Sequence, residues 1–243
     1  CINRKVTMRL SNLSRREFIR RGVAGTAAAI AAPYFVPSSV FGANERIGIA
    51  VIGPGRQGAG LLASAGKSSL ARIVAVADVN LPRARKAAEK YKAAVYQDYR
   101  KLLERKDVDA VISATPEHWR ALTCIHACQA GKDVYAEKPM TLTIREGRLM
   151  VEATRKYKRV FQCGSQQRSQ IQNWFDCIRS REKPIADVEI GHRSATVCHL
   201  GNIARWTGKR LKWDPVKERF DDAEANKYLD RARRKPYELP ETI

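Results

Sequence analysis

Three glycines are spaced to bring a polypeptide backbone close to phosphate groups. Gly53, Gly55 and Gly58 form a Gly-x-Gly-x-x-Gly motif with Arg56 and Gln57 inside it. In such a motif the first glycine makes a tight turn, the second admits a diphosphate, and the third lets a helix pack closely on a strand. Free N–H groups at the start of the following helix then bind the phosphates. The motif predicts a dinucleotide-binding site.

An acidic residue further along the chain supports this prediction. Asp78 follows Gly58 by about twenty residues, the spacing at which a carboxylate binds the adenosine ribose hydroxyls and disfavours a 2′-phosphate. Taken alone, Asp78 would equally suit a helix N-cap. With the glycine motif it favours NAD as the cofactor. Arg83 follows closely and suits a phosphate, so NADP stays open.

The elements that must position these residues alternate between strand and helix. Short apolar, β-branched runs predict strands at 47–52, 72–77, 94–96, 109–114, 132–136 and 160–163. The stretches between them predict helices at 59–65, 81–91, 98–105 (with Asp98 as N-cap), 118–130 and 144–157. This alternation predicts an α/β fold, a Rossmann-type doubly wound parallel sheet. Ligands of such sheets bind where the strands end, and Thr115, His118, Glu137, Lys138 and Gly164 all fall there.

Three further motifs carry a family resemblance. After the glycine motif come Thr115-Pro116-x-His118, then Glu137-Lys138-Pro139, then Gly164-x-Gln166-Gln167-Arg168. In this order and spacing they resemble the glucose–fructose oxidoreductase / inositol dehydrogenase (Gfo/Idh/MocA) family, most tellingly through Glu-Lys-Pro. Family members join this domain to an open-faced antiparallel sheet domain. Many oxidise or reduce sugars and cyclic polyols.

The resemblance also implies roles for individual residues. Thr115, Pro116, His118 and Glu137 would line the nicotinamide end of the cofactor. The alternative for His118 is that it only caps the helix that it opens, as histidines at that position often do. Lys138 would reach the nicotinamide ribose and the reacting oxygen.

A lysine at that position suits the chemistry of alcohol oxidation. A fixed cation stabilises charge on the oxygen and can pass the hydroxyl proton on. The alternative for Lys138 is an exposed structural lysine after a strand. By the same resemblance Gln167 and Arg168, in the motif that closes the sheet, are cofactor-binding candidates.

After residue 169 the chain no longer follows the order of segments that is typical of the family. Family members continue into a second domain that supplies most of the substrate site and usually a histidine acid/base. Such a domain needs on the order of 100–150 residues. Here a predicted helix at 172–181, an apolar helix at 195–206 and a closing tail at 211–239 resemble the far C-terminal end of the family instead. We therefore expect an internal deletion near residue 170. We also expect a mainly helical remnant of an α+β domain, without the strands that would bury its apolar helices, and structural roles for His192 and His199.

The first 43 residues resemble a twin-arginine export signal. Arg15 and Arg16 precede an apolar, alanine-rich stretch at 22–36, and a cut after Ala43 is plausible. We expect a signal peptide at 1–43, an NAD(P)-binding Rossmann domain at 44–169 and the C-terminal remnant at 170–243. The protein would then be periplasmic or secreted. The twin-arginine route carries folded proteins, which suits one that acquires its nucleotide in the cytoplasm.

Charge and cysteine content argue against several other classes of protein. The net charge of +20 is spread along the chain, and no nucleic-acid module is present, so we expect no nucleic-acid partner. No apolar run reaches the roughly 18–20 residues of a membrane span. None of the six cysteines forms a Cys-x-x-Cys pair, so no zinc site is expected. Cys124 and Cys128 share a helical face and should pack inward.

Three functions are compatible with these patterns. The first is NAD(P)-dependent hydride transfer to or from a small sugar or cyclic polyol. The second is an NAD-dependent glycosidase, because some secreted members of the family hydrolyse glycosides by transient oxidation. The third is a remnant that binds nucleotide without turnover. The expected absence of most of the second domain supports this function. Oligomeric state stays open, because the family associates through the sheet domain that is absent here.

Overall fold

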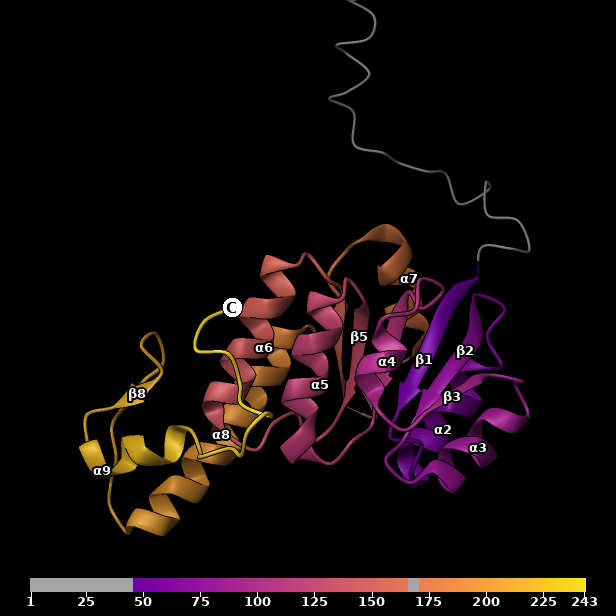
Figure 1. Ribbon diagram of the computed structural model, residues 1–243. Helices are drawn as coiled ribbons and strands as arrows, with labels where there is room; N and C mark the ends of the chain where they lie inside the picture. The colour runs from indigo at the N-terminus through magenta and orange to yellow at the C-terminus, as the bar shows by residue number, and fades with distance from the viewer. Residues whose placement is uncertain (1–45, 166–170) are drawn as a thin grey trace, which may run out of the picture. The chain divides into compact units, whose positions relative to one another are not determined.

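The computed structural model describes residues 46–165 and 171–243 (Figure 1). The twin-arginine motif, Gln167 and Arg168 lie outside the described residues. From Glu45 to Ile243 the chain forms one compact unit. No helix among the described residues has the length and apolar character needed to cross a membrane.

A six-stranded sheet forms the centre of this unit. Its strands, in chain order, are β1 (Ile47–Ile52), β2 (Ala71–Ala77), β3 (Ala94–Tyr96), β4 (Ala110–Ser113), β5 (Asp133–Glu137) and β6 (Phe161–Gly164). They pair in the order β3-β2-β1-β4-β5-β6, and every pairing is parallel. The order reverses between β1 and β4, which places the switch point of a doubly wound fold beside the glycine motif. The predicted Rossmann-type α/β fold is confirmed.

Helices cover both faces of the sheet because successive strand side chains point to opposite faces. The helices are α2 (Arg56–Ala65), α3 (Leu81–Glu89), α4 (Tyr99–Leu103), α5 (Glu117–Gln129), α6 (Ile144–Lys156), α7 (Ile171–Ser180), α8 (Val188–Thr207) and α9 (Ala223–Asn226), with a 3₁₀ helix η2 at Lys227–Leu229. Ala50 and Ile52 of β1 belong to the cluster that α4, α5 and α6 cover. Ile49 and Val51 belong to the opposite cluster, which contains α2 and α7.

The first helix of the C-terminal part packs on the Rossmann sheet. Trp174 and Phe175 of α7 are fully buried, and the Trp174 ring lies 5.6 Å from the ring of Tyr135 on β5. These two aromatic side chains fill the face of the sheet beside α2. The Rossmann sheet itself therefore buries α7.

Helix α8 is also longer than predicted, and it packs on α6. It begins at Val188 rather than at residue 195, because the Asp187 side chain caps it by accepting a hydrogen bond from the Glu189 N–H. The crossing of the two helices is close. A Cβ atom on Gly147 of α6 would come 2.2 Å from Nδ1 of His192 on α8. Only a residue without a side chain fits there.

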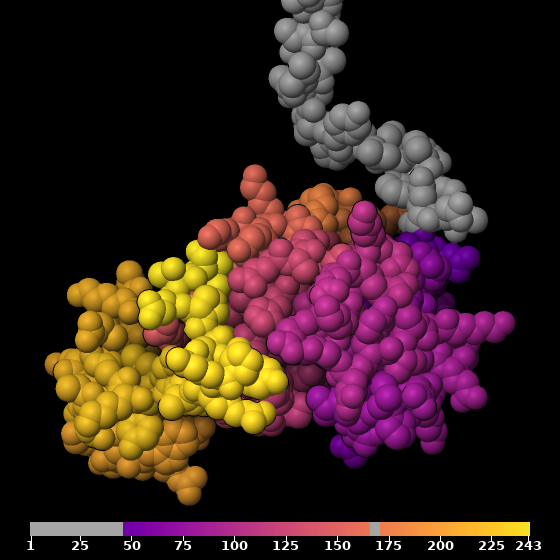
Figure 2. Space-filling view, in the orientation of Figure 1, coloured from indigo at the N-terminus to yellow at the C-terminus, as the bar shows by residue number. Residues whose placement is uncertain are grey.

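The chain ends in short elements and an extended segment. After α8 come a two-stranded ladder of β7 (Trp213–Asp214) and β8 (Arg219–Phe220), then α9 and η2. The extended segment that follows runs back across the front of α6 and α5, as the yellow ribbon of Figure 1 shows. In Figure 2 its residues lie directly against those of the magenta region.

Candidate functional site

The glycine motif forms a tight turn between β1 and α2. Gly53 has φ of +80°, a conformation that L side chains rarely adopt. A Cβ on Gly58 would come 2.3 Å from the Gly53 carbonyl oxygen, so the helix can approach the turn only with glycine there. A Cβ on Gly55 would meet no atom within 4 Å. Gly53 and Gly58 thus serve the turn and its packing, while Gly55 faces open space.

The N-terminus of α2 is free to bind an anion. Gly55 is its N-cap and supplies no side-chain hydrogen bond, and the first turn carries no acidic residue. The unpaired N–H groups and the positive end of the helix macrodipole therefore face the open space beside Gly55. A diphosphate fits this arrangement. The helix starts at Arg56, three residues before the predicted start, and this places Arg56 and Gln57 in its first turn.

Asp78 lies at the end of β2, where the motif spacing predicted it. Its side chain is nearly buried, and Arg83 binds it through two hydrogen bonds of 2.7 and 2.8 Å. The Asn80 N–H donates a third at 2.9 Å. Hydrogen bonding to Asp78 raises the pKa of Arg83. Asp78 is not an N-cap, since the side chain that caps α3 is that of Asn80.

A cavity of about 610 Å³ lies at this end of the sheet, within the size range of small-molecule sites. It brings together five of the predicted site residues, namely Gly53, Asp78, Thr115, Pro116 and His118. Residues after β3 and on α5 complete much of the lining, among them Gln97, Tyr99 and Trp119. Gly55, Arg56, Gln57, Gly58, Glu137 and Lys138 are not part of this lining.

Glu137 connects the glycine turn to the loop after β5. It is buried, its Oε1 accepts a hydrogen bond from the Gln57 side chain at 3.2 Å, and its Oε2 accepts one from the Lys138 N–H at 3.0 Å. Glu137 is thereby held between α2 and its own loop. Lys138 is exposed and precedes Pro139 across a cis peptide bond.

Arg120 is a site residue that the sequence analysis missed. It is 3% exposed, and its guanidinium donates hydrogen bonds to the carbonyls of Thr115 and Pro139. Burial lowers the pKa of this guanidinium. Arg120 therefore ties together the loops after β4 and β5, which carry the Thr-Pro and Glu-Lys-Pro motifs. Its place in a helical run gave no signal of this role.

Cys124 and Cys128, behind the site, pack inward as predicted. Cys124 and Cys128 of α5 are buried in the apolar cluster, and burial raises the pKa of each thiol to about 12. Both stay protonated at neutral pH, where a thiol neither binds a metal nor acts as a nucleophile. Across 46–165 and 171–243 no cluster of His, Cys, Asp and Glu suits a metal ion.

The two histidines of the C-terminal part lie elsewhere. His192 is buried at the α6–α8 crossing, where its Nε2 is 2.8 Å from Oε1 of Glu218. Nε2 of His199 lies 3.4 Å from the Thr141 hydroxyl. Neither lines the cavity. Their surroundings fit the structural roles that the sequence analysis expected.

Known proteins share these features. The oxidoreductase-family model for an NAD-binding Rossmann fold matches residues 47–165, and the oxidoreductase-family C-terminal alpha/beta model matches residues 151–239. The chain is 30% identical over 177 residues to a 2,7-anhydro-N-acetylneuraminate hydratase of Mediterraneibacter gnavus, which is 72% of this chain and 45% of that protein.

Two further relatives differ in their named activity. A glycosyl hydrolase family 109 protein of Shewanella is 33% identical over 163 residues, covering 56% of this chain and 36% of its own. An inositol 2-dehydrogenase/D-chiro-inositol 3-dehydrogenase of Shouchella clausii is 39% identical over 105 residues, covering 42% and 30%. The chain spans less than half the length of each relative. The two family models, taken with the glycine turn and the sheet, show that this chain belongs to the Gfo/Idh/MocA oxidoreductase family and carries its NAD-binding Rossmann fold.

Proposed function

We propose that this protein transfers hydride between NAD(P) and a small sugar or cyclic polyol. The observation that carries the proposal is the turn at Gly53–Gly58, with open space beside Gly55 and an uncapped helix N-terminus facing it. The relative named inositol dehydrogenase supports a polyol substrate. Because the chain spans less than half of that relative, the substrate class belongs to the proposal.

The residues present fit a bound dinucleotide. Gly55 and the N–H groups of α2 would hold the diphosphate, and Asp78 would hold the adenosine ribose. Asp78 favours NAD, whereas Arg83 beside it leaves NADP usable. When bound, the nicotinamide ring supplies the site that gives or takes hydride. Lys138, at the C-terminal end of β5, would stabilise charge on the alcohol oxygen and relay its proton.

Binding of the nucleotide is tested by fluorescence titration with NADH on the full chain. We expect saturable binding by the parent protein and weak or no binding by Gly55→Trp and Asp78→Ala. A substitution away from the cavity, Lys90→Ala on the exposed surface after α3, serves as the control. Unchanged affinity in both site variants would remove the dinucleotide site from the proposal.

Turnover is tested separately by following NADH formation with a panel of sugars and cyclic polyols. Where a substrate is found, we expect Lys138→Ala to lower kcat by a larger factor than it weakens NADH binding. An unchanged rate in this variant would exclude Lys138 from the mechanism. Binding without turnover on any substrate would leave the third function, a nucleotide-binding remnant.

A second candidate is an NAD-dependent glycosidase, which the glycosyl hydrolase relative favours. The two activities differ in net cofactor balance, because a glycosidase of this kind oxidises and then reduces the same sugar. Release of the aryl group from aryl glycosides without net NADH would favour the glycosidase. Net NADH with a free sugar would favour the dehydrogenase.

We further propose export by the twin-arginine route to the periplasm or cell exterior, with a signal peptide at 1–43. The Rossmann domain would then be 44–169 and the C-terminal part 170–243. Fractionation of a bacterial host tests this: we expect processed protein in the periplasm, and its loss when Arg15 and Arg16 are both replaced by lysine. Processing that persists in that variant would point to another route.

The short join between β6 and α7 supports an internal deletion near residue 170. The sheet ends at Gly164 and the next helix begins at Ile171, where the family resemblance calls for a domain. Reading the native gene across the codons for Gly164 to Trp174 tests this proposal. An extra segment of domain length there would place the acid/base histidine within it, whereas an uninterrupted reading would favour the remnant.

A further inference from the structure

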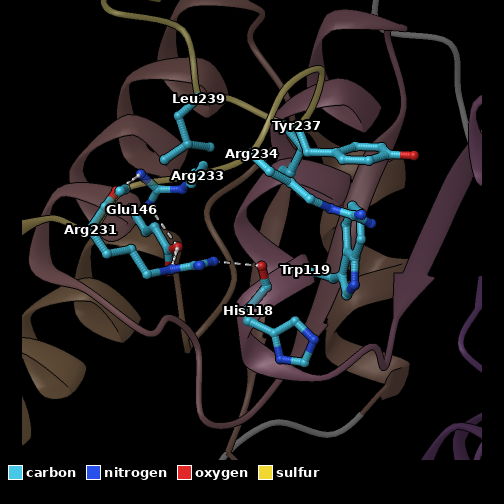
Figure 3. Close-up of a pocket in the computed structure, with 10 residues that line it drawn as sticks. His118, Trp119, Glu146, Arg231, Arg233, Arg234, Tyr237 and Leu239 are labelled. Carbon is cyan, nitrogen blue, oxygen red and sulfur yellow. Dashed lines mark hydrogen bonds and ion pairs between the residues drawn. The ribbon is translucent and has the colours of Figure 1, made fainter.

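The C-terminal strap, which we define as residues 230–239, crosses the start of α5 (Figure 3). Arg231 donates a hydrogen bond to the His118 carbonyl at 3.0 Å. The ring of Tyr237 stands edge-on to that of Trp119, with centroids 4.8 Å apart. Leu239 packs against the main apolar cluster. The strap thus lies on the helix that follows the Thr-Pro motif.

A buried carboxylate fastens the strap. Glu146 is 1% exposed, and its Oε2 accepts hydrogen bonds from the N–H groups of Leu142 and Thr143, which directly precede α6. Its Oε1 accepts one from Arg233 at 2.8 Å, and the Arg233 side chain is only 9% exposed. Figure 3 shows Arg231 approaching the same carboxylate, at 3.5 Å. A nearly buried, hydrogen-bonded ion pair holds position better than an exposed one.

The fastened strap forms part of the cavity that contains Asp78. Arg234 and Tyr237 line it together with Gly53, Asp78 and Trp119. Gly53 belongs to the diphosphate turn and Asp78 to the ribose position, so the part of the cavity that these two residues line is the adenosine half of the proposed cofactor site. The far end of the chain therefore contributes a wall to a site otherwise built by its first half.

Arg234 is the cation of this wall that lacks an acidic partner. Two other arginines line the cavity, and each binds a carboxylate: Arg83 binds Asp78, and Arg100 binds Asp98. In the part of the chain that the structure describes, the guanidinium of Arg234 forms no hydrogen bond or ion pair, and it lies over the Tyr237 ring, 5.2 Å from its centroid. A guanidinium stacked on an aromatic ring keeps its N–H groups available in the ring plane, and phosphate is the ligand they fit best.

We propose that the strap closes the adenosine half of the dinucleotide site and that Arg234 binds a phosphate of the adenine nucleotide. Tyr237 positions this guanidinium and adds an aromatic wall. The inference rests on the proposed cofactor site and adds a phosphate-binding residue to it. The ligand chemistry is an adenosine phosphate, which is either the diphosphate of both cofactors or the 2′-phosphate of NADP.

The test measures dissociation constants of the full chain for NADH and for NADPH. We expect Arg234→Gln to weaken binding about tenfold, as the loss of one charge-assisted phosphate contact does. Weakening for both nucleotides identifies the diphosphate, and weakening for NADPH alone identifies the 2′-phosphate. Arg210→Gln is the matched control, because it removes one positive charge from an exposed residue outside the cavity. We expect it to bind as the parent does.

Two results would overturn the inference. Parent-like affinity of Arg234→Gln for both nucleotides would remove Arg234 while leaving the cofactor site intact. Failure of the parent to bind either nucleotide would remove the cofactor site and the strap's role together. Arg234→Lys adds a second variant: it keeps the charge but loses the planar group, so it should recover part of the affinity. Tyr237→Ala should weaken binding in the same direction by several-fold.

Discussion

Gly55 and Gly58 stand three residues apart and should respond to substitution in opposite ways. A side chain at Gly58 would collide with the Gly53 carbonyl, whereas one at Gly55 meets only open space. We therefore expect Gly58→Val to destabilise the fold by several kcal/mol, the scale of overpacking. Gly55→Val should keep the parent's thermal unfolding midpoint and lose NADH binding. Calorimetry and titration of the same two proteins check this, and a stable Gly58→Val would contradict it.

Arg120 connects two loops through carbonyl oxygens, so its loss should loosen both. Arg120→Met keeps much of the volume but removes the donor from the Thr115 and Pro139 carbonyls, at a cost of about 1–3 kcal/mol for the buried Thr115 carbonyl. We expect a lower free energy of unfolding in urea and weaker NADH binding. Arg120→Lys should recover little, because one ammonium group cannot match the guanidinium fork. Recovery of parent affinity by the lysine variant would show that only the charge matters.

The sequence predicts some of these residues better than others. Gly53, Gly58 and Asp78 are predictable because each acts within one local turn, and the spacing of that turn is visible in the chain. Arg120, Glu146 and Arg234 act between segments far apart in sequence. Their roles depend on tertiary contacts between two loops and the strap. No local sequence pattern predicts such contacts.

At the scale of elements, α7 is held by two aromatic side chains. Trp174 is fully buried against Tyr135 and Phe175, with ring centroids 5.6 and 5.4 Å away. Trp174→Ala should therefore lower the free energy of unfolding by about 3–5 kcal/mol. Trp206→Ala on α8 is the matched control, since that side chain is 59% exposed; it should change stability far less. Equal effects of the two in urea denaturation would contradict the packing described.

The α6–α8 crossing should be sensitive to acid. Burial lowers the pKa of His192 below 6.5 in the folded protein, although Glu218 acts in the opposite direction. The unfolded chain then binds the proton more readily, so this contribution to stability is fully present above pH 6.5. It is lost as the pH falls below 6.5 and through the lowered folded value. We expect unfolding free energies to decline over this window, and a flatter decline in His192→Gln.

The sequence predicted most elements but placed α8 poorly. The strand at 94–96 and the strand at 47–52 coincide with β3 and β1 because short apolar runs between turn residues have few alternatives. Helix α8 begins seven residues before the predicted start. Its first turns include Gly191 and His192, which look unhelical in sequence. They suit close packing: His192 lies at the α6–α8 crossing, and a Cβ on Gly191 would come 2.8 Å from Cys163 of β6 and from Met140.

At the scale of the whole molecule, the Rossmann sheet and the C-terminal part contribute to each other's packing and to the cavity. The sheet supplies the surface that buries α7, and the strap supplies part of the wall around Asp78. Helix α7 packs on the Rossmann sheet and α8 packs on α6, so these two helices cover part of the Rossmann domain.

This interdependence makes a prediction about truncation. Ending the chain after residue 170 would uncover Tyr135 on one face of the sheet and Phe161 on the other, both buried in the full chain. Exposed apolar faces of a sheet promote association between molecules. We expect the shortened chain to be poorly soluble, or to lack a cooperative unfolding transition, whereas a chain beginning at Asn44 and keeping its C-terminus should unfold in one step. Circular dichroism during heating distinguishes the two. A soluble 44–170 fragment with the parent's midpoint would mean that the Rossmann domain folds alone, and the C-terminal segment would then contribute to nucleotide binding without supporting the fold.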